Sequence, residues 1–140
     1  MINTHKPHPW TLDHIAHAVK NLDAAIATYK STLGVEPSAR EVISEQKVEV
    51  VFFDTHSGSI ELLAPLPGNV TLRKFLDSRG EGLHHIAYKV LDISEELLRL
   101  ESQGISCIDS KPRKGSRNTL IAFLHPKSFG GVLVELVEEL

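Results

Sequence analysis

The sequence predicts an α+β protein built from two tandem βαβββ modules, and three observations support this fold class. An octapeptide at residues 12–19, LDHIAHAV, returns 71 residues later as LHHIAYKV at 83–90, with five of the eight positions identical. Each copy is followed by a helix-like stretch. Each half then closes on an apolar strand that carries one acid, Glu61 in the first half and Glu135 in the second.

Composition indicates one compact domain and excludes several classes of protein. With 140 residues, 41% of them hydrophobic, the chain can form a real core, and we expect a single domain at 11–140 after an N-terminal tail at 1–10. The net charge of −3 argues against nucleic-acid binding, which requires a basic footprint. No stretch approaches the ~20 apolar residues that span a bilayer, so we expect no membrane partner. The single cysteine, Cys107, cannot form an internal disulfide, which favours the cytoplasm.

The first module is expected at about 11–66. Residues 11–19 alternate as a strand, and Asn21 begins a capping signal for a helix at 23–33, which Gly34 ends. Three more strands are expected after this helix, at 38–44, 47–54 and 59–64.

The second module is expected at about 83–138, after a connector at 65–82 with a short helix at 71–78. It begins with the repeated strand and continues with a helix at 94–103, for which Ser94 is a suitable N-cap and Gly104 a suitable end. Its remaining strands are expected at 105–109, 118–124 and 131–137.

Four recurring residues predict a metal site where the modules meet. Side chains alternate between the two faces of a strand, so His14 shares its face with Ala16 and Ala18, and His85 shares its face with Ala87 and Lys89. Glu61 and Glu135 lie in strands that otherwise look buried, where a carboxylate without a partner is costly. Taken singly, each of the four is more often a structural residue. Their recurrence at equivalent places favours two imidazoles and two carboxylates around one divalent cation.

Two further features have competing interpretations. Glu49 is the only charge in the apolar run 48–53, and it is either an edge-strand charge that blocks aggregation or a base in the cavity. The basic loop Lys111, Arg113, Lys114 and Arg117 is either a phosphate contact or a solvated loop, and we favour the solvated loop. The six other histidines are interpreted as non-ligands: His5, His8, His17, His56, His84 and His125.

Several motifs resemble those of a known superfamily. They are LDHIA at 12–16, ELLAPL at 61–66, GLHHIA at 82–87, FLHPKS at 123–128 and GGVLVEL at 130–136. With them the chain resembles the vicinal oxygen chelate (glyoxalase/bleomycin-resistance) superfamily, and within it the methylmalonyl-CoA epimerase branch, of which the last two motifs are typical.

The resemblance implies a glyoxalase-like, cupped mixed sheet around a metal site. The ligands would be His14, Glu61, His85 and Glu135, holding Co²⁺, Mn²⁺, Ni²⁺ or Zn²⁺. The implied reaction interconverts the C2 epimers of methylmalonyl-CoA by removal of the alpha proton through a metal-stabilised enolate, with Glu49 and Glu135 as base and acid. The implied partners are a small acyl-CoA substrate and a second copy of the chain in a homodimer. A glyoxalase I-type lactoylglutathione lyase and a non-catalytic small-molecule binder are the alternatives.

Overall fold

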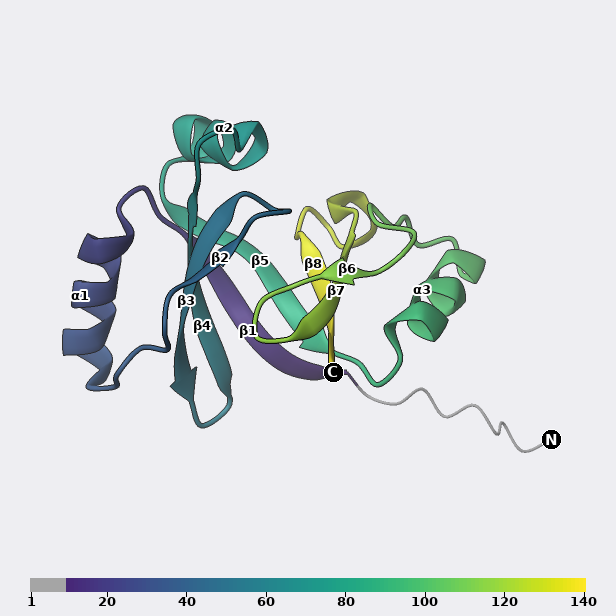
Figure 1. Cartoon of the computed structure of the whole chain (residues 1–140). Helices are drawn as coiled ribbons and strands as arrows, with labels where there is room; N and C mark the ends of the chain where they lie inside the picture. The colour runs from purple at the N-terminus through teal and green to yellow at the C-terminus, as the bar shows by residue number, and fades with distance from the viewer. Residues whose placement is uncertain (1–9) are drawn as a thin grey trace.

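The computed structural model describes residues 10–140, which form one curled mixed sheet flanked by helices (Figure 1). The first half of the chain contributes β1 (Thr11–Ala18), α1 (Leu22–Leu33), β2 (Glu41–Ile43), β3 (Val48–Thr55) and β4 (Gly58–Pro65). The connecting helix is α2 (Val70–Arg79). The second half contributes β5 (Gly82–Lys89), α3 (Ile93–Ser102), β6 (Arg113–Lys114), β7 (Thr119–Leu124), a 3₁₀ helix (Pro126–Ser128) and β8 (Val134–Glu139). The predicted fold class, with βαβββ twice, is confirmed.

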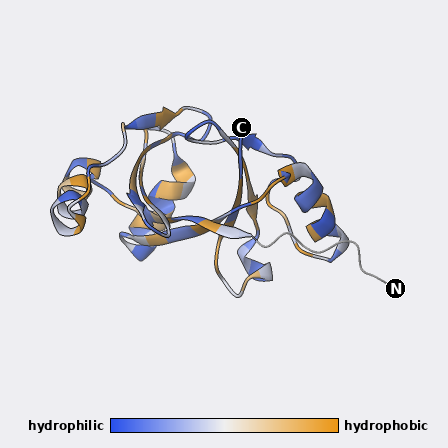
Figure 2. Ribbon diagram, turned by 90° about the horizontal axis from the view of Figure 1, so that it is seen from below, coloured by the Kyte–Doolittle hydropathy of each residue, from blue (hydrophilic) through white to orange (hydrophobic). Residues whose placement is uncertain are grey.

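The strand order is β2-β3-β4-β1-β5-β8-β7-β6, so the two repeated strands lie side by side at the centre of the sheet. β1 and β5 pair antiparallel, while each pairs in parallel with the last strand of its own half, β4 or β8. Viewed from below, the strands outline a nearly closed ring (Figure 2). This curl gives the sheet an inner face, on which both halves meet.

Helix ends follow local capping chemistry. Asn21 caps α1 by accepting a hydrogen bond from the backbone N of Ala24 at 3.0 Å, and Gly34 ends the helix in the left-handed region at φ 68°. The N-cap of α3 is Asp92, whose side chain accepts from the backbone N of Glu95 at 3.0 Å. The prediction of Ser94 as this cap is therefore wrong, because the aspartate two residues earlier already satisfies the free N–H.

The strand predicted at 105–109 is also absent from the described residues. Only Cys107 forms an isolated bridge, with Leu124, and the short edge strand β6 lies at Arg113–Lys114 instead. Two successive backbone N–H groups, of Ile108 and Asp109, both donate to the carbonyl of Phe123, which breaks the regular ladder of a strand.

The core is divided between the two faces of the sheet. On the outer face, α1 packs against Val51, Phe53 and Leu62, and α3 packs against strand residues of the second half. On the inner face of the first half, Val48, Val50, Phe52 and Leu63 pack with residues of α2. The inner face of the first half is thus lined largely by apolar side chains.

The N-terminal tail was predicted at 1–10, and its residues 1–9 lie outside the described part of the chain. Trp10 is half-buried: its Nε1 donates to Glu96 Oε1 at 2.7 Å, and its ring lies 5.4 Å from that of Tyr88. No helix of the described residues has the length and apolar character needed to cross a membrane.

Candidate metal and substrate site

Two histidines and two glutamates converge on the inner face of the sheet, as the repeat predicted. The Nε2 atoms of His14 and His85 lie 3.2 Å apart. His14 Nε2 lies 3.6 Å from Glu61 Oε2 and 3.4 Å from Glu135 Oε1. His85 Nε2 lies 3.9 Å from Glu61 Oε1 and 3.6 Å from Glu135 Oε2. All four residues are buried, none being more than 6% exposed.

Strand register explains this convergence. Residues opposite one another on neighbouring strands direct their side chains to the same face of a sheet. The antiparallel pair β1–β5 and the parallel pairs β1–β4 and β5–β8 bring the four residues around two small, fully buried alanines. Ala16 lies between His85 and Glu61, and Ala87 lies between His14 and Glu135.

The other nitrogen of each imidazole is also engaged. His14 Nδ1 lies 2.6 Å from Asp13 Oδ2; because an ionised carboxylate only accepts, Nδ1 is the donor, and in the neutral ring Nε2 then carries no proton. His85 Nδ1 lies 2.8 Å from Nδ1 of His84. Such partners fix the tautomer and orientation of metal-ligating histidines. Sequence reasoning missed both partners, although each directly precedes its histidine in the repeat.

Burial makes this arrangement unfavourable without a cation. It raises the pKa of Glu135 to about 8, against the lowering effect of His14, and it also raises the pKa of Glu61. Burial lowers the pKa of His85 well below its usual range. At His14 burial acts to lower the pKa, but the hydrogen bond to Asp13 and the charges of Glu61 and Glu135 outweigh it, so this pKa is raised.

The donor set fits a divalent metal ion. His14, His85 and Glu135 each offer a ligand atom within 4.8 Å of the others. Ligands bound at about 2.1 Å around one octahedral ion lie about 3.0 Å apart when adjacent and about 4.2 Å apart when opposite. The distances of 3.2–3.9 Å among the four side chains fall between these limits. A mixture of imidazole and carboxylate donors suits several divalent metals.

Two cavities meet at these side chains. The larger, about 670 Å³, is lined by His14 and Glu135 together with polar groups such as Ser59 and Arg117. The smaller, about 400 Å³, is lined by Glu61, His85 and Glu135, and by apolar side chains that include Val48, Val50, Leu63 and Leu72. Glu135 therefore borders both cavities.

Glu49 was predicted as a base in the cavity, and the structure does not place it there. It lies on β3 opposite Ala64, on the face that Val51 and Phe53 present to α1. Its side chain is 31% exposed, and its Oε1 lies 4.0 Å from Arg40 Nε. The inner face of β3 carries the residues on either side of it. This placement favours the alternative of a charge on the outer surface.

The basic loop is not uniform. Lys111 and Lys114 are exposed, whereas Arg113 lines the smaller cavity with its guanidinium carbon 5.6 Å from the ring centroid of Phe123. Arg117 is also exposed, but it lines the larger cavity and contacts residues of the first half. The sequence pattern did not separate these two arginines from the two lysines, because the difference depends on how the loop crosses the sheet.

Comparison with known proteins agrees with this geometry. The Glyoxalase/Bleomycin resistance protein/Dioxygenase superfamily matches residues 13–123. An ethylmalonyl-CoA/methylmalonyl-CoA epimerase of Cereibacter sphaeroides is 40% identical over 127 residues, covering 89% of this chain and 95% of the relative. The crystal structure of methylmalonyl-CoA epimerase from Mycobacterium tuberculosis superimposes with a TM-score of 0.88 at 38% identity, covering 93% of this chain and 88% of that one.

A further solved structure, a methylmalonyl-CoA epimerase in complex with methylmalonyl-CoA and NH4⁺, gives a TM-score of 0.88 at 35% identity and covers 94% of this chain and 96% of that one. The match thus spans both halves of the sheet. The chain belongs to the Glyoxalase/Bleomycin resistance protein/Dioxygenase superfamily and, within it, to the methylmalonyl-CoA epimerase family.

Proposed function

We propose that this protein is a metal-dependent epimerase that interconverts the C2 epimers of methylmalonyl-CoA. The observation that carries the proposal is the buried set of two imidazoles and two carboxylates, contributed equally by the two halves. Its relatives named methylmalonyl-CoA epimerase support the choice of substrate. His14, Glu61, His85 and Glu135 would hold the metal, of which Co²⁺, Mn²⁺, Ni²⁺ and Zn²⁺ all suit these donors.

The reaction removes the proton from C2, alpha to the thioester, and returns a proton to the opposite face. When bound, the cation would polarise the thioester carbonyl and spread the negative charge that develops at the enolate. We assign the proton transfers to the carboxylates of Glu135 and Glu61, the two buried carboxylates of the described residues. Both line the smaller cavity, one from each half of the chain, which suits a base and an acid that exchange roles with the direction of reaction.

The smaller cavity suits the apolar parts of an acyl-CoA, because its valine and leucine walls lie next to Glu61 and Glu135.

We further propose a homodimer. On the outer face of the central strands, Ile15 and Ile86 are opposite one another and half-buried, between the regions that α1 and α3 cover (Figure 1). A second copy of the chain would cover these apolar side chains.

We place the protein in the cytoplasm because of its single cysteine, Cys107. We also propose that residues 11–140 form one domain.

A hydrogen-exchange experiment tests the function. The metal-loaded protein is incubated with methylmalonyl-CoA in deuterated water, and the C2 proton is followed by NMR. We expect metal-dependent loss of the C2 signal, and protein treated with a chelator is the control. If the C2 proton does not exchange while the hemithioacetal of methylglyoxal and glutathione is turned over, the protein is a glyoxalase I-type lyase and the proposal is wrong.

A further inference from the structure

We propose that Arg117 is a positioning residue for His14: it acts from the second half of the chain on the residues that hold this imidazole in the first half. The inference rests on the proposed metal site, because its measurable consequence is the affinity of that site for a cation. Arg117 itself is no candidate ligand, since a guanidinium has no acceptor.

Arg117 lies in the turn between β6 and β7, and this turn contacts the opposite edge of the sheet. Arg117 and Asn118 have φ values of 52° and 55°, in the left-handed region that residues with side chains seldom adopt. The backbone N of Arg117 donates to Glu41 Oε1 on β2 at 3.0 Å. A second contact joins the same two edges of the sheet, because Gln46 Nε2 donates to the carbonyl of Lys114 at 3.2 Å. The turn is therefore anchored to the opposite end of the strand order.

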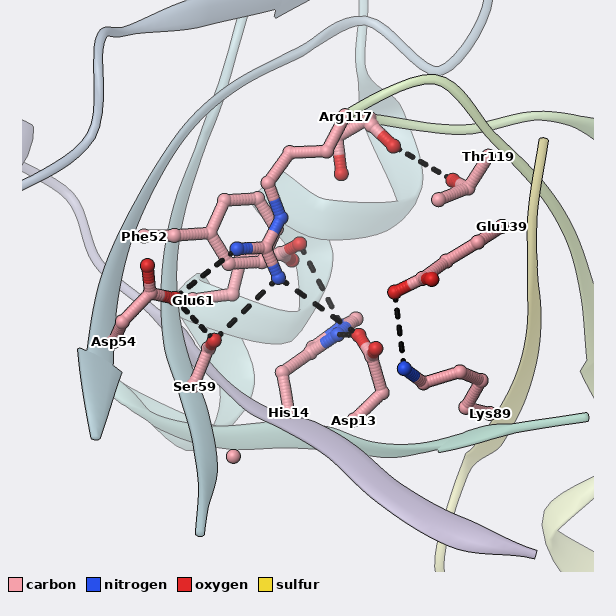
Figure 3. Close-up of polar contacts among 12 residues, drawn as sticks. Asp13, His14, Phe52, Asp54, Ser59, Glu61, Lys89, Arg117, Thr119 and Glu139 are labelled. Carbon is pink, nitrogen blue, oxygen red and sulfur yellow. Dashed lines mark hydrogen bonds and ion pairs between the residues drawn. The ribbon is translucent and has the colours of Figure 1, made fainter. Parts of the chain in front are cut away.

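The side chain of Arg117 reaches four residues of the first half (Figure 3). Its guanidinium carbon lies 3.7 Å from the ring centroid of Phe52. Nη1 donates to Asp54 Oδ1 at 3.2 Å. Nη2 donates to Ser59 Oγ at 3.5 Å and lies 3.9 Å from Asp13 Oδ2.

Three of these four residues surround His14. Asp13 accepts a hydrogen bond from its Nδ1 at 2.6 Å. Phe52 meets the imidazole edge to face, with ring centroids 5.5 Å apart and planes at 81°. Ser59 is the register partner of His14 on β4. One guanidinium thus contacts a hydrogen-bond partner, a packing partner and a strand neighbour of the same ligand.

The contacts differ in weight. Asp54 is 72% exposed, and ion pairs at that exposure contribute little, so this contact does not hold the arginine in place. Asp13 is only 13% exposed, and the distance to Phe52 matches a stacked cation, which a planar guanidinium forms better than an ammonium. We therefore expect Arg117 to act mainly through Asp13 and Phe52. Residues that orient a ligand typically change metal affinity by about 10- to 100-fold when removed.

Metal binding to the stripped protein tests this role. Arg117→Met replaces the guanidinium with an unbranched apolar side chain, which removes the positive charge and the hydrogen-bond donors. Titration with Co²⁺ alone is followed by calorimetry, and the visible absorption of the bound Co²⁺ reports its coordination. We expect the variant to bind Co²⁺ about tenfold more weakly and with an altered spectrum, at the lower end of the range for ligand-orienting residues. Arg117→Lys should recover part of the affinity.

Lys89→Met is the matched control. Lys89 lines the same cavity, pairs with Glu139 at 3.0 Å, and removal of its ammonium changes the net charge equally. A purely electrostatic effect would strengthen Co²⁺ binding in both variants, because each loses a positive charge that repels the cation, whereas loss of positioning weakens it only in Arg117→Met. Thermal unfolding of the metal-free variants checks that both remain folded.

Asp13→Asn completes the test. If Arg117 acts through Asp13, the effect of Arg117→Met shrinks when Asn occupies position 13. Equal Co²⁺ affinity and spectrum in the wild type and Arg117→Met would overturn the inference while leaving the metal site intact, and so would an equal loss in Lys89→Met. Failure of the wild type to bind Co²⁺ would instead refute the proposed function.

Discussion

Removal of the metal should make the stability of this protein fall as the pH rises from 6.5 to 8.5. In the folded, metal-free protein burial raises the pKa of Glu135 to about 8 from a usual value of 4.5. A carboxyl whose folded pKa is raised stabilises the fold fully below the unfolded pKa, and this contribution is lost as the pH rises through the folded pKa. The raised pKa of His14 acts in the same direction above 6.5.

His85, whose titration opposes that of Glu135, sets the lower limit of this pH range. The lowered pKa of His85 means that its protonation destabilises the fold, so below 6.5 it offsets the effect of Glu135, and above 6.5 it is neutral in both states. Between pH 6.5 and 8.5 the titration of Glu135 therefore removes about 2 kcal/mol from the free energy of unfolding. For a chain of this size that corresponds to a fall of about 6 °C in melting temperature.

Thermal unfolding at pH 6.5, 7.5 and 8.5, with and without a chelator, measures this effect. Metal-loaded protein should show no comparable fall, because its ligands are deprotonated throughout this range. Glu135→Gln keeps the shape of the side chain without its titration, so the metal-free variant should lose most of the slope. A stripped wild type with a constant melting temperature over this range, equal to that of Glu135→Gln, would refute the reasoning.

Two substitutions test the assignments at the site. His85→Ala should leave the purified protein with little bound metal by elemental analysis, because one of four donors is lost, whereas the exposed His56→Ala should retain it; full occupancy in His85→Ala would exclude His85 as a ligand. Glu49→Gln should change turnover by less than about twofold, because Glu49 lies on the face covered by α1. The loss of a general base lowers turnover by about 10²-fold or more, so a drop of that size would show that Glu49 is a catalytic base.

The local structure could largely be predicted from the sequence. The repeat located both central strands, and cap residues located the helix ends to within one or two residues, as Asn21 and Gly34 show for α1. The error at 105–109 arose because an alternating pattern near Cys107 resembles a strand. The two N–H groups that converge on Phe123 are a tertiary contact, which periodicity does not contain.

The sequence by itself determined the fold class and the four converging residues, because duplicated strands occupy equivalent places and carry equal residue types to one centre. It also placed Glu49 with Val51 and Phe53, since alternation is a local property of the strand. Only the tertiary structure decided which face of β3 is the inner one, and this moved Glu49 out of the cavity. Only the curl of the sheet brought Arg117 to Phe52 and Asp13, because contacts between its two ends depend on the accumulated twist of all the strands between them.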